Sequence, residues 1–328
     1  MRIFLLLLAL VAWARVSAQI TIDEYRQQVL SRSLELMSAE AESEKLLSRS
    51  NQQRTNFLPA LSASGEFTTA FRRNDGADLW GFSIVPRIEQ TLYAGGGVRA
   101  AYRQALINYD ASLDEQSQLS LEMRFAADNA YWMVSAMQLY KAATDEYVSL
   151  IRSLYDVVQE RFAEGYVAKS DLLQVEARLS DAEYSQIASQ NNYDLALHQF
   201  NNLRREADSI SVVLTNSIID DLPTPPRATL EHIMEYRPDV AMAKKSILAA
   251  EYGVDVVQAG YNPSLTAGVS GSWKTYSPNR SGKTYLDGAL VVGMNVPIFH
   301  WRERRHAVAA ARRDVEQSQL ALEQLCED

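Results

Sequence analysis

The chain contains an internal repeat, and this feature limits its fold more than any other. The segment Phe57–Ala63 (FLPALSA) matches Tyr261–Ala267 (YNPSLTA) with an offset of 204 residues, as Pro59 and Pro263 show. Leu34-Glu35-Leu36 precedes Pro238-Asp239-Val240 by the same offset, and Gln90-Thr91-Leu92-Tyr93 precedes Val296-Pro297-Ile298-Phe299 by 206 residues. Order and spacing are kept throughout, so the sequence predicts two copies of one structural unit.

Each copy contains two segments in which apolar and polar residues alternate, at 58–92 and at 263–298. This period of two is typical of strands with one apolar and one polar face. The alternation continues for about ten residues, whereas strands of soluble proteins usually have about five or six and tilted membrane-spanning strands about nine to eleven. We therefore predict four membrane strands; the alternative is a long soluble hairpin pair packed on helices. The predicted lipid-facing residues are Phe67, Phe82, Val269, Trp273, Leu290 and Val292.

Aromatic residues gather near the ends of these segments, where membrane barrels carry interfacial girdles. They are Trp80, Trp273, Tyr276, Tyr285, Phe299 and Trp301.

Long helices are predicted between the strand pairs. Residues 98–164 contain neither proline nor glycine, which corresponds to a helix of roughly 100 Å. Spacing of four and three predicts a coiled-coil seam formed by Ala126, Ala130, Met133, Met137, Tyr140, Thr144, Tyr147, Ile151, Leu154 and Val158. A returning seam consists of Leu172, Val175, Leu179, Ala182, Gln186, Ser189, Tyr193, Ala196, Phe200 and Leu203. An antiparallel helical hairpin is therefore expected at 97–206, with Gly165 ending the first helix and Ser170 capping the second.

The first eighteen residues have the pattern of a signal peptide. Arg2 precedes the apolar run Ile3–Val11, and Val16-Ser17-Ala18 provides small residues for cleavage before Gln19. A bilayer-spanning helix needs about twenty apolar residues, so this run is too short to be one. The sequence predicts an exported protein.

The remaining charge is acidic. Removing Arg2 and Arg15 leaves 30 of the 32 basic residues against 41 acidic ones, a net charge of −11, which argues against nucleic acid as a partner. Cys326 is the only cysteine, so no intrachain disulfide can form. The histidines have no metal-ligand spacing, and Gly95-Gly96-Gly97 lacks the ending of a phosphate-binding loop. We predict no catalytic residue, metal or cofactor.

A basic run follows the last predicted strand. Its members are Arg302, Arg304, Arg305, Arg312 and Arg313. The run is interpreted as a solvated helix face or as a contact with anionic groups near the membrane surface.

Four membrane strands cannot form a closed barrel alone. An open strand edge would leave backbone groups unpaired in hydrocarbon, and bacterial barrels begin at about eight strands. Several copies of the chain are therefore expected to share one barrel.

In this order, the motifs resemble the TolC-type outer-membrane efflux proteins. They are the two Pro-x-Leu strand entries at Pro59 and Pro263, Leu92-Tyr93-x-Gly95-Gly96, the hairpin tip 161–173, and Arg237-Pro238-Asp239. The resemblance implies a fold that is mainly α with membrane β: a periplasmic α-barrel of long antiparallel coiled-coil helices and a shared transmembrane β-barrel. It also implies a homotrimer in outer-membrane lipid that docks to a periplasmic adaptor and an inner-membrane pump. Gly165, Tyr166 and Val167 would contact the adaptor, although Gly165 could simply end a helix.

The predicted organisation is a signal peptide at 1–18, a first repeat at 19–206, a linker at 207–226 and an incomplete second repeat at 227–328. Members of the family complete both repeats, so we expect a fragment or a truncated gene product. The predicted function is that of an outer-membrane channel subunit of a tripartite efflux or type I secretion system, without enzymatic activity. The alternatives are a periplasmic coiled-coil scaffold or adhesin without a pore and, more distantly, an exported hydrolase.

Overall fold

The computed structural model describes residues 19–69, 80–207, 212–220, 229–275 and 285–327. The predicted signal peptide, parts of the predicted linker (208–211 and 221–226) and Tyr276 lie outside the described residues. The chain divides into two compact units. We call Met1–Met37 with Leu119–Arg227 the hairpin unit, and Ser38–Gln118 with Ala228–Asp328 the sheet unit.

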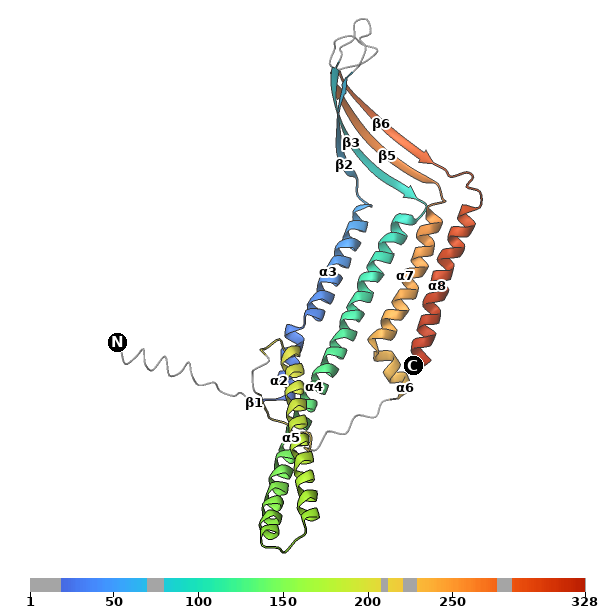
Figure 1. The fold of residues 1–328 in the computed structure, drawn as a ribbon. Helices are drawn as coiled ribbons and strands as arrows, with labels where there is room; N and C mark the ends of the chain where they lie inside the picture. Colours follow the sequence, from blue (N-terminus) through green and yellow to red (C-terminus); the bar gives the residue numbers. More distant parts are fainter. Residues whose placement is uncertain (1–18, 70–79, 208–211, 221–228, 276–284, 328) are drawn as a thin grey trace, which may run out of the picture. The chain divides into compact units, whose positions relative to one another are not determined.

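The sheet unit contains the predicted long strands. They are β2 (Ala60–Thr69), β3 (Trp80–Ala94), β5 (Ser264–Lys274) and β6 (Tyr285–Asn295). All neighbours are antiparallel, in the order β2-β3-β5-β6 (Figure 1). β6 ends before the predicted Val296 and Ile298, because Pro297 has no amide hydrogen to donate to a neighbouring strand.

Each strand of the sheet unit is joined to a helix at the same end of the sheet (Figure 1). The helices are α3 (Leu34–Thr55), α4 (Gly97–Ala163), α7 (Pro238–Ala259) and α8 (Glu303–Glu327). A short helix, α6 (Leu230–Tyr236), precedes α7, and α7 packs beside α8. No described helix is both long and apolar enough to cross a membrane.

The turn from β3 into α4 depends on two glycines with positive φ, Gly95 (60°) and Gly96 (90°). The Asn262 side-chain amide donates a hydrogen bond to the Gly95 carbonyl oxygen at 3.2 Å. A Cβ atom on Gly95 would lie 2.4 Å from the Asn262 Cβ. Glycine is therefore required at position 95 both for its backbone conformation and for the close approach of the α7–β5 connection.

Helix α7 begins within the Arg-Pro-Asp motif. Arg237 is the N-cap and Pro238 the first helical residue, where a missing amide hydrogen costs nothing. The Arg237 guanidinium donates to both Asp239 carboxylate oxygens, at 3.1 and 2.8 Å. This hydrogen bonding lowers the pKa of Asp239, although partial burial acts in the opposite direction.

The hairpin unit combines the later part of α4 with α5 (Lys169–Leu203) and α2 (Ile22–Arg32). Two residues of β1 (Gln19–Ile20) pair in parallel with β4 (Val213–Leu214). This small sheet has no counterpart in the sequence prediction, and it ties the beginning of the described chain to a segment that follows the hairpin.

An aromatic core lies beneath this small sheet. Tyr25 stacks on Phe200 with ring centroids 3.9 Å apart, and Tyr131 lies at about 6 Å from both rings. The Tyr25 hydroxyl donates to the Phe200 carbonyl oxygen (3.0 Å), and the Tyr131 hydroxyl donates to the Ile20 carbonyl oxygen (2.9 Å). Burial raises the pKa of both tyrosines. These bonds satisfy the buried hydroxyls, so the core joins α2, α4, α5 and β1.

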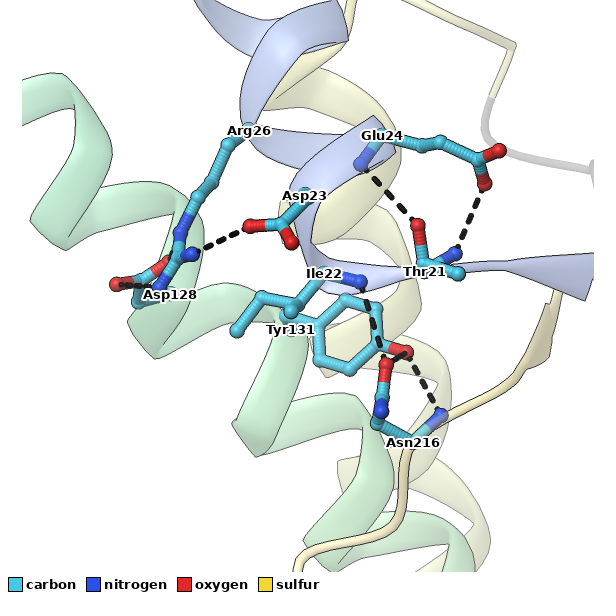
Figure 2. A network of polar contacts seen from close by, with 8 residues as sticks. All are labelled: Thr21, Ile22, Asp23, Glu24, Arg26, Asp128, Tyr131 and Asn216. Atoms are coloured by element: carbon cyan, nitrogen blue, oxygen red, sulfur yellow. Dashed lines mark hydrogen bonds and ion pairs between the residues drawn. The ribbon is translucent and has the colours of Figure 1, made fainter. Parts of the chain in front are cut away.

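Polar contacts continue this core towards the surface of the hairpin unit (Figure 2). Thr21 and Glu24 cap α2 reciprocally, at 3.3 and 3.1 Å. Arg26 binds both carboxylate oxygens of Asp128, at 2.5 and 2.8 Å. The backbone N–H of Asn216 donates a hydrogen bond to the Tyr131 hydroxyl oxygen at 3.1 Å.

The α5 seam is confirmed by burial, whereas part of the α4 seam is wrong by one residue. The buried residues Ala127, Tyr131, Val134 and Val148 each follow a predicted seam residue. Thr144 and Ile151 are buried as predicted. Two polar residues of the seams form a hydrogen bond between their hydroxyls, Thr144 with Ser189 at 2.6 Å.

Candidate functional site

The strand register places all six predicted lipid-facing residues on one face of the sheet. Phe67 lies opposite Phe82, and Val269 lies opposite Leu290. Trp273 and Val292 share this face because strand residues two positions apart point to the same side. We call this surface the apolar face.

The apolar face is exposed in the described chain. Its six predicted residues range from 38% exposure for Phe82 and Trp273 to 76% for Leu290. Aromatic pairs extend across the strands, with Phe82 and Trp273 edge to face at 6.2 Å. A contiguous apolar surface of this kind marks a contact with lipid or protein.

The opposite surface of the sheet, the polar face, carries small and charged residues. Arg87 and Glu89 form an ion pair on it at 3.8 Å. Its further members include Ser62, Ser64, Glu66, Ser270, Lys274 and Asp287. A Cβ atom on Gly268 would lie 2.8 Å from the Ile88 carbonyl oxygen, so glycine allows β3 and β5 to approach closely there. The two faces of the sheet therefore differ in polarity.

The sheet has two open edges in the described part of the chain, since β2 and β6 each pair with a single neighbour. Their outer backbone groups are available to strands from another molecule. A sheet with an apolar face, a polar face and two unpaired edges has the properties of one segment of a larger barrel.

The hairpin tip is formed by the turn between α4 and α5. Gly165 has φ 79°. Its amide hydrogen is donated to the Phe162 carbonyl oxygen at 3.0 Å, and that of Tyr166 to the Arg161 carbonyl oxygen at 2.9 Å. This pair of bonds is the Schellman ending of a helix. Gly165, Tyr166 and Val167 are thus brought together, and their contact with an adaptor stays a prediction.

The predicted cap of the second hairpin helix is wrong. Ser170 lies inside α5, whose N-cap is Ala168. The Asp171 carboxylate accepts the Ala168 amide hydrogen at 3.3 Å, so the acidic residue and not the serine satisfies the helix start. An aspartate in the first turn is also favoured by the helix dipole.

Within the described ranges, no group of three or more His, Cys, Asp or Glu side chains could hold a metal ion. Cys326 is exposed.

Sequence reasoning missed the polar core of the hairpin unit. The Thr21-x-x-Glu24 capping signal could have located the start of α2. No local signal identifies Asn216, whose partners Ile22 and Tyr131 are 194 and 85 residues away in the sequence.

Comparisons with known proteins agree with this geometry. A family described as "Outer membrane efflux protein" matches residues 25–204 and 229–325. The pyoverdine export outer membrane protein OpmQ of Pseudomonas aeruginosa is 25% identical over 264 residues, covering 75% of this chain and 51% of OpmQ. The alkaline protease secretion protein AprF of the same organism is 22% identical over 230 residues, covering 69% of this chain and 47% of AprF. The chain thus spans about half the length of these relatives.

Solved structures show the same fold. The outer membrane channel CmeC of Campylobacter jejuni superposes with a TM-score of 0.79 at 17% identity, covering 93% of this chain and 67% of CmeC. The predicted fold class, with long antiparallel helices joined to membrane-type strands, is confirmed. The predicted resemblance to TolC-type proteins is also confirmed, because the family match covers most of the sequence and concerns transport channels rather than enzymes. The chain belongs to the outer membrane efflux protein family.

Proposed function

We propose that the chain is a channel subunit that provides a passive exit duct across the periplasm and the outer membrane. The observation that carries this proposal is the four-stranded sheet, which is exposed and apolar on one face, polar on the other and, among the residues that the structure describes, unpaired at both edges. Such a sheet is stable in a bilayer once further copies close it into a barrel, with the polar faces lining the pore. The long helices joined to one end of the sheet would form the periplasmic part of the duct.

The assembly we infer is a homotrimer held in outer-membrane lipid, working with a periplasmic adaptor and an inner-membrane pump. Support comes from family membership and from the names of the relatives, which describe pyoverdine export and alkaline protease secretion. Efflux and type I secretion are therefore both within the proposal. The proposed organisation is the repeat pair at 19–206 and 227–328 with its linker at 207–226.

Cell fractionation and conductance measurements test the channel. We expect heat-resistant oligomers in the outer-membrane fraction and voltage-dependent current steps when the purified oligomer is added to a planar lipid bilayer. A monomer recovered from the soluble periplasm, without conductance, would contradict the proposal. That outcome would favour the alternative, a periplasmic scaffold or adhesin without a pore.

The proposed adaptor contact is tested separately at the hairpin tip. A photo-crosslinking amino acid at Tyr166, which is 76% exposed, should link the chain to its adaptor in cells. Tyr184 provides the matched control, because it is 74% exposed on the side of α5 and away from the turn. Equal crosslinking at both positions would contradict a specific adaptor contact at the hairpin tip.

A further inference from the structure

A basic groove lies along the first turns of α8, directly after the last strand. The groove has a volume of about 900 Å³ and is lined by Arg302, Arg304, Arg305, Arg312, Arg313 and Glu316. Gln258 of α7 contributes to its wall. Figure 1 shows α8 following β6 at the end of the sheet where the helices begin.

The charge of this groove is largely uncompensated. Its single lining carboxylate, Glu316, forms an ion pair with Arg313. Over the described ranges, the other four arginines form no ion pair within 4 Å. Arginines clustered in this way repel one another, so the groove is expected to bind an anion.

An exposed apolar corner adjoins the groove. Ile298 is 91% exposed and Trp301 86% exposed, and Phe299 packs against Trp301 edge to face at 4.9 Å. Trp301 and Arg302 both have positive φ, 43° and 70°, a conformation that is strained for residues other than glycine. The strained turn connects the apolar corner with the first arginine of the groove.

The length of β6 indicates the depth of this corner in the membrane. β6 has 11 residues, which is about the length that a tilted strand needs to cross the hydrocarbon of a bilayer. Residues directly after Asn295 then lie at the level of the lipid headgroups. Aromatic side chains concentrate at that level in membrane barrels.

We propose that this corner and groove bind the anionic phospholipid headgroups of the periplasmic leaflet. The apolar corner would enter the boundary of the acyl chains, and the arginines would bind headgroup phosphates. Guanidinium groups bind phosphate oxygens through paired hydrogen bonds, which lysine does not reproduce. The inference rests on the proposed function, because that function sets the depth and orientation of β6.

The test uses the purified full chain and vesicles of two compositions, phosphatidylcholine alone or with phosphatidylglycerol. Binding is measured by co-flotation with the vesicles. We expect the wild-type chain to prefer phosphatidylglycerol vesicles, since each basic residue near an anionic surface strengthens binding. The variant Arg302→Gln/Arg304→Gln/Arg305→Gln/Arg312→Gln should lose this preference, with apparent affinity for the anionic vesicles up to roughly a thousandfold lower, because the four contributions add.

A matched variant separates the groove from total charge. Arg49, Arg54, Arg161 and Arg178 are exposed and lie outside the groove, so changing all four to Gln removes the same charge elsewhere. This control should keep the preference. Replacing the four groove arginines with lysine should restore only part of it.

Four outcomes would overturn the inference. The first is equal binding by the groove variant and the wild type, and the second is an equal loss of binding in the groove and control variants. The third is displacement of the vesicles by inorganic phosphate alone, and the fourth is a loss of oligomers with unchanged lipid preference. The third would indicate a free-anion site, and the fourth would show that a second copy of the chain covers the groove. A chain that inserts and conducts but shows no preference contradicts this inference alone. A chain that does not enter membranes contradicts the proposed function instead.

Discussion

Tyr131 joins three segments of the hairpin unit through one hydroxyl group. The hydroxyl donates to the Ile20 carbonyl oxygen at 2.9 Å and accepts the Asn216 amide hydrogen at 3.1 Å. Tyr131→Phe leaves both backbone groups without this partner, so we expect a loss of about 1–3 kcal/mol in the free energy of unfolding. Denaturant titration followed by circular dichroism measures the change.

The control for this prediction is Tyr147→Phe on the same helix. The Tyr147 side chain is 48% exposed, so water can replace any bond of its hydroxyl and the change should be within about 0.5 kcal/mol. A comparable loss in both variants would show that the buried hydroxyl has no special role.

The neighbouring glycines Gly95 and Gly96 should differ in how much an alanine substitution destabilises the fold. Both have positive φ, so alanine at either position costs about 1–2 kcal/mol of backbone strain. Only at position 95 would the new Cβ also lie 2.4 Å from Asn262, which adds roughly 1–3 kcal/mol of overlap. Gly95→Ala should therefore lower the thermal midpoint more than Gly96→Ala, and equal midpoints would exclude the overlap.

The sequence predicts residues well where the signal is local. Phe67 and Val269 were assigned to the apolar face from a period of two, and the strand register places both there. Tyr131 could not be assigned to the core, because its partner Ile20 is 111 residues away in the sequence.

At the scale of elements, the two hairpin seams differ in how far the sequence determines them. On α5 most seam positions are flanked by polar residues, so one face is favoured, although Ala196 lies between Leu195 and Leu197. On α4, by contrast, both residues are apolar in each of three neighbouring pairs: Ala130-Tyr131, Met133-Val134 and Tyr147-Val148. Either member keeps the spacing of four and three. Packing against α2, α5 and β1 selects Tyr131 and Val134, and packing against α5 selects Val148. The seam of α4 is therefore a tertiary property.

The junction between α6 and α7 gives a pH-dependent prediction. The Arg237 guanidinium lowers the pKa of Asp239 below its ordinary value of 3.8. Because the pKa of this carboxyl group is lower in the folded chain than in the unfolded chain, its charge stabilises the fold at pH values above the unfolded pKa. This stabilisation is lost as the pH falls through the folded pKa. Asp239→Asn should cost about 0.5–1 kcal/mol at neutral pH because the pair is only partly buried.

The thermal midpoints of wild type and Asp239→Asn should therefore differ at pH 7 and converge as the pH is lowered below 3.8. Unfolding curves recorded by circular dichroism at both pH values measure this. A difference that persists unchanged in acid would attribute the effect to something other than the carboxylate charge.

At the scale of the whole molecule, the two faces of the sheet should respond oppositely to charge. Val269→Lys places an ammonium on the apolar face and should cost about 2–4 kcal/mol near the middle of the bilayer. Ala289→Lys lies at nearly the same depth, since Ala289 is opposite Ser270, but on the polar face. There we expect a loss below about 1 kcal/mol.

Urea titration of the two variants in lipid vesicles, with heat-resistant oligomer as the readout, compares these losses. Equal sensitivity on both faces would mean that lipid does not cover one of them, which would support the scaffold alternative. The comparison does not depend on the transported cargo.

The parallel pairing of β1 with β4 also sets an order of events during folding. Gln19 and Ile20 precede the helical hairpin, whereas their partners Val213 and Leu214 follow the whole of α4 and α5. A contact across so long a loop forms slowly unless the intervening chain has already brought its ends together. The helical hairpin, whose contacts are closer in sequence, should therefore fold first, and attachment of the N-terminal segment would then report that the hairpin is complete.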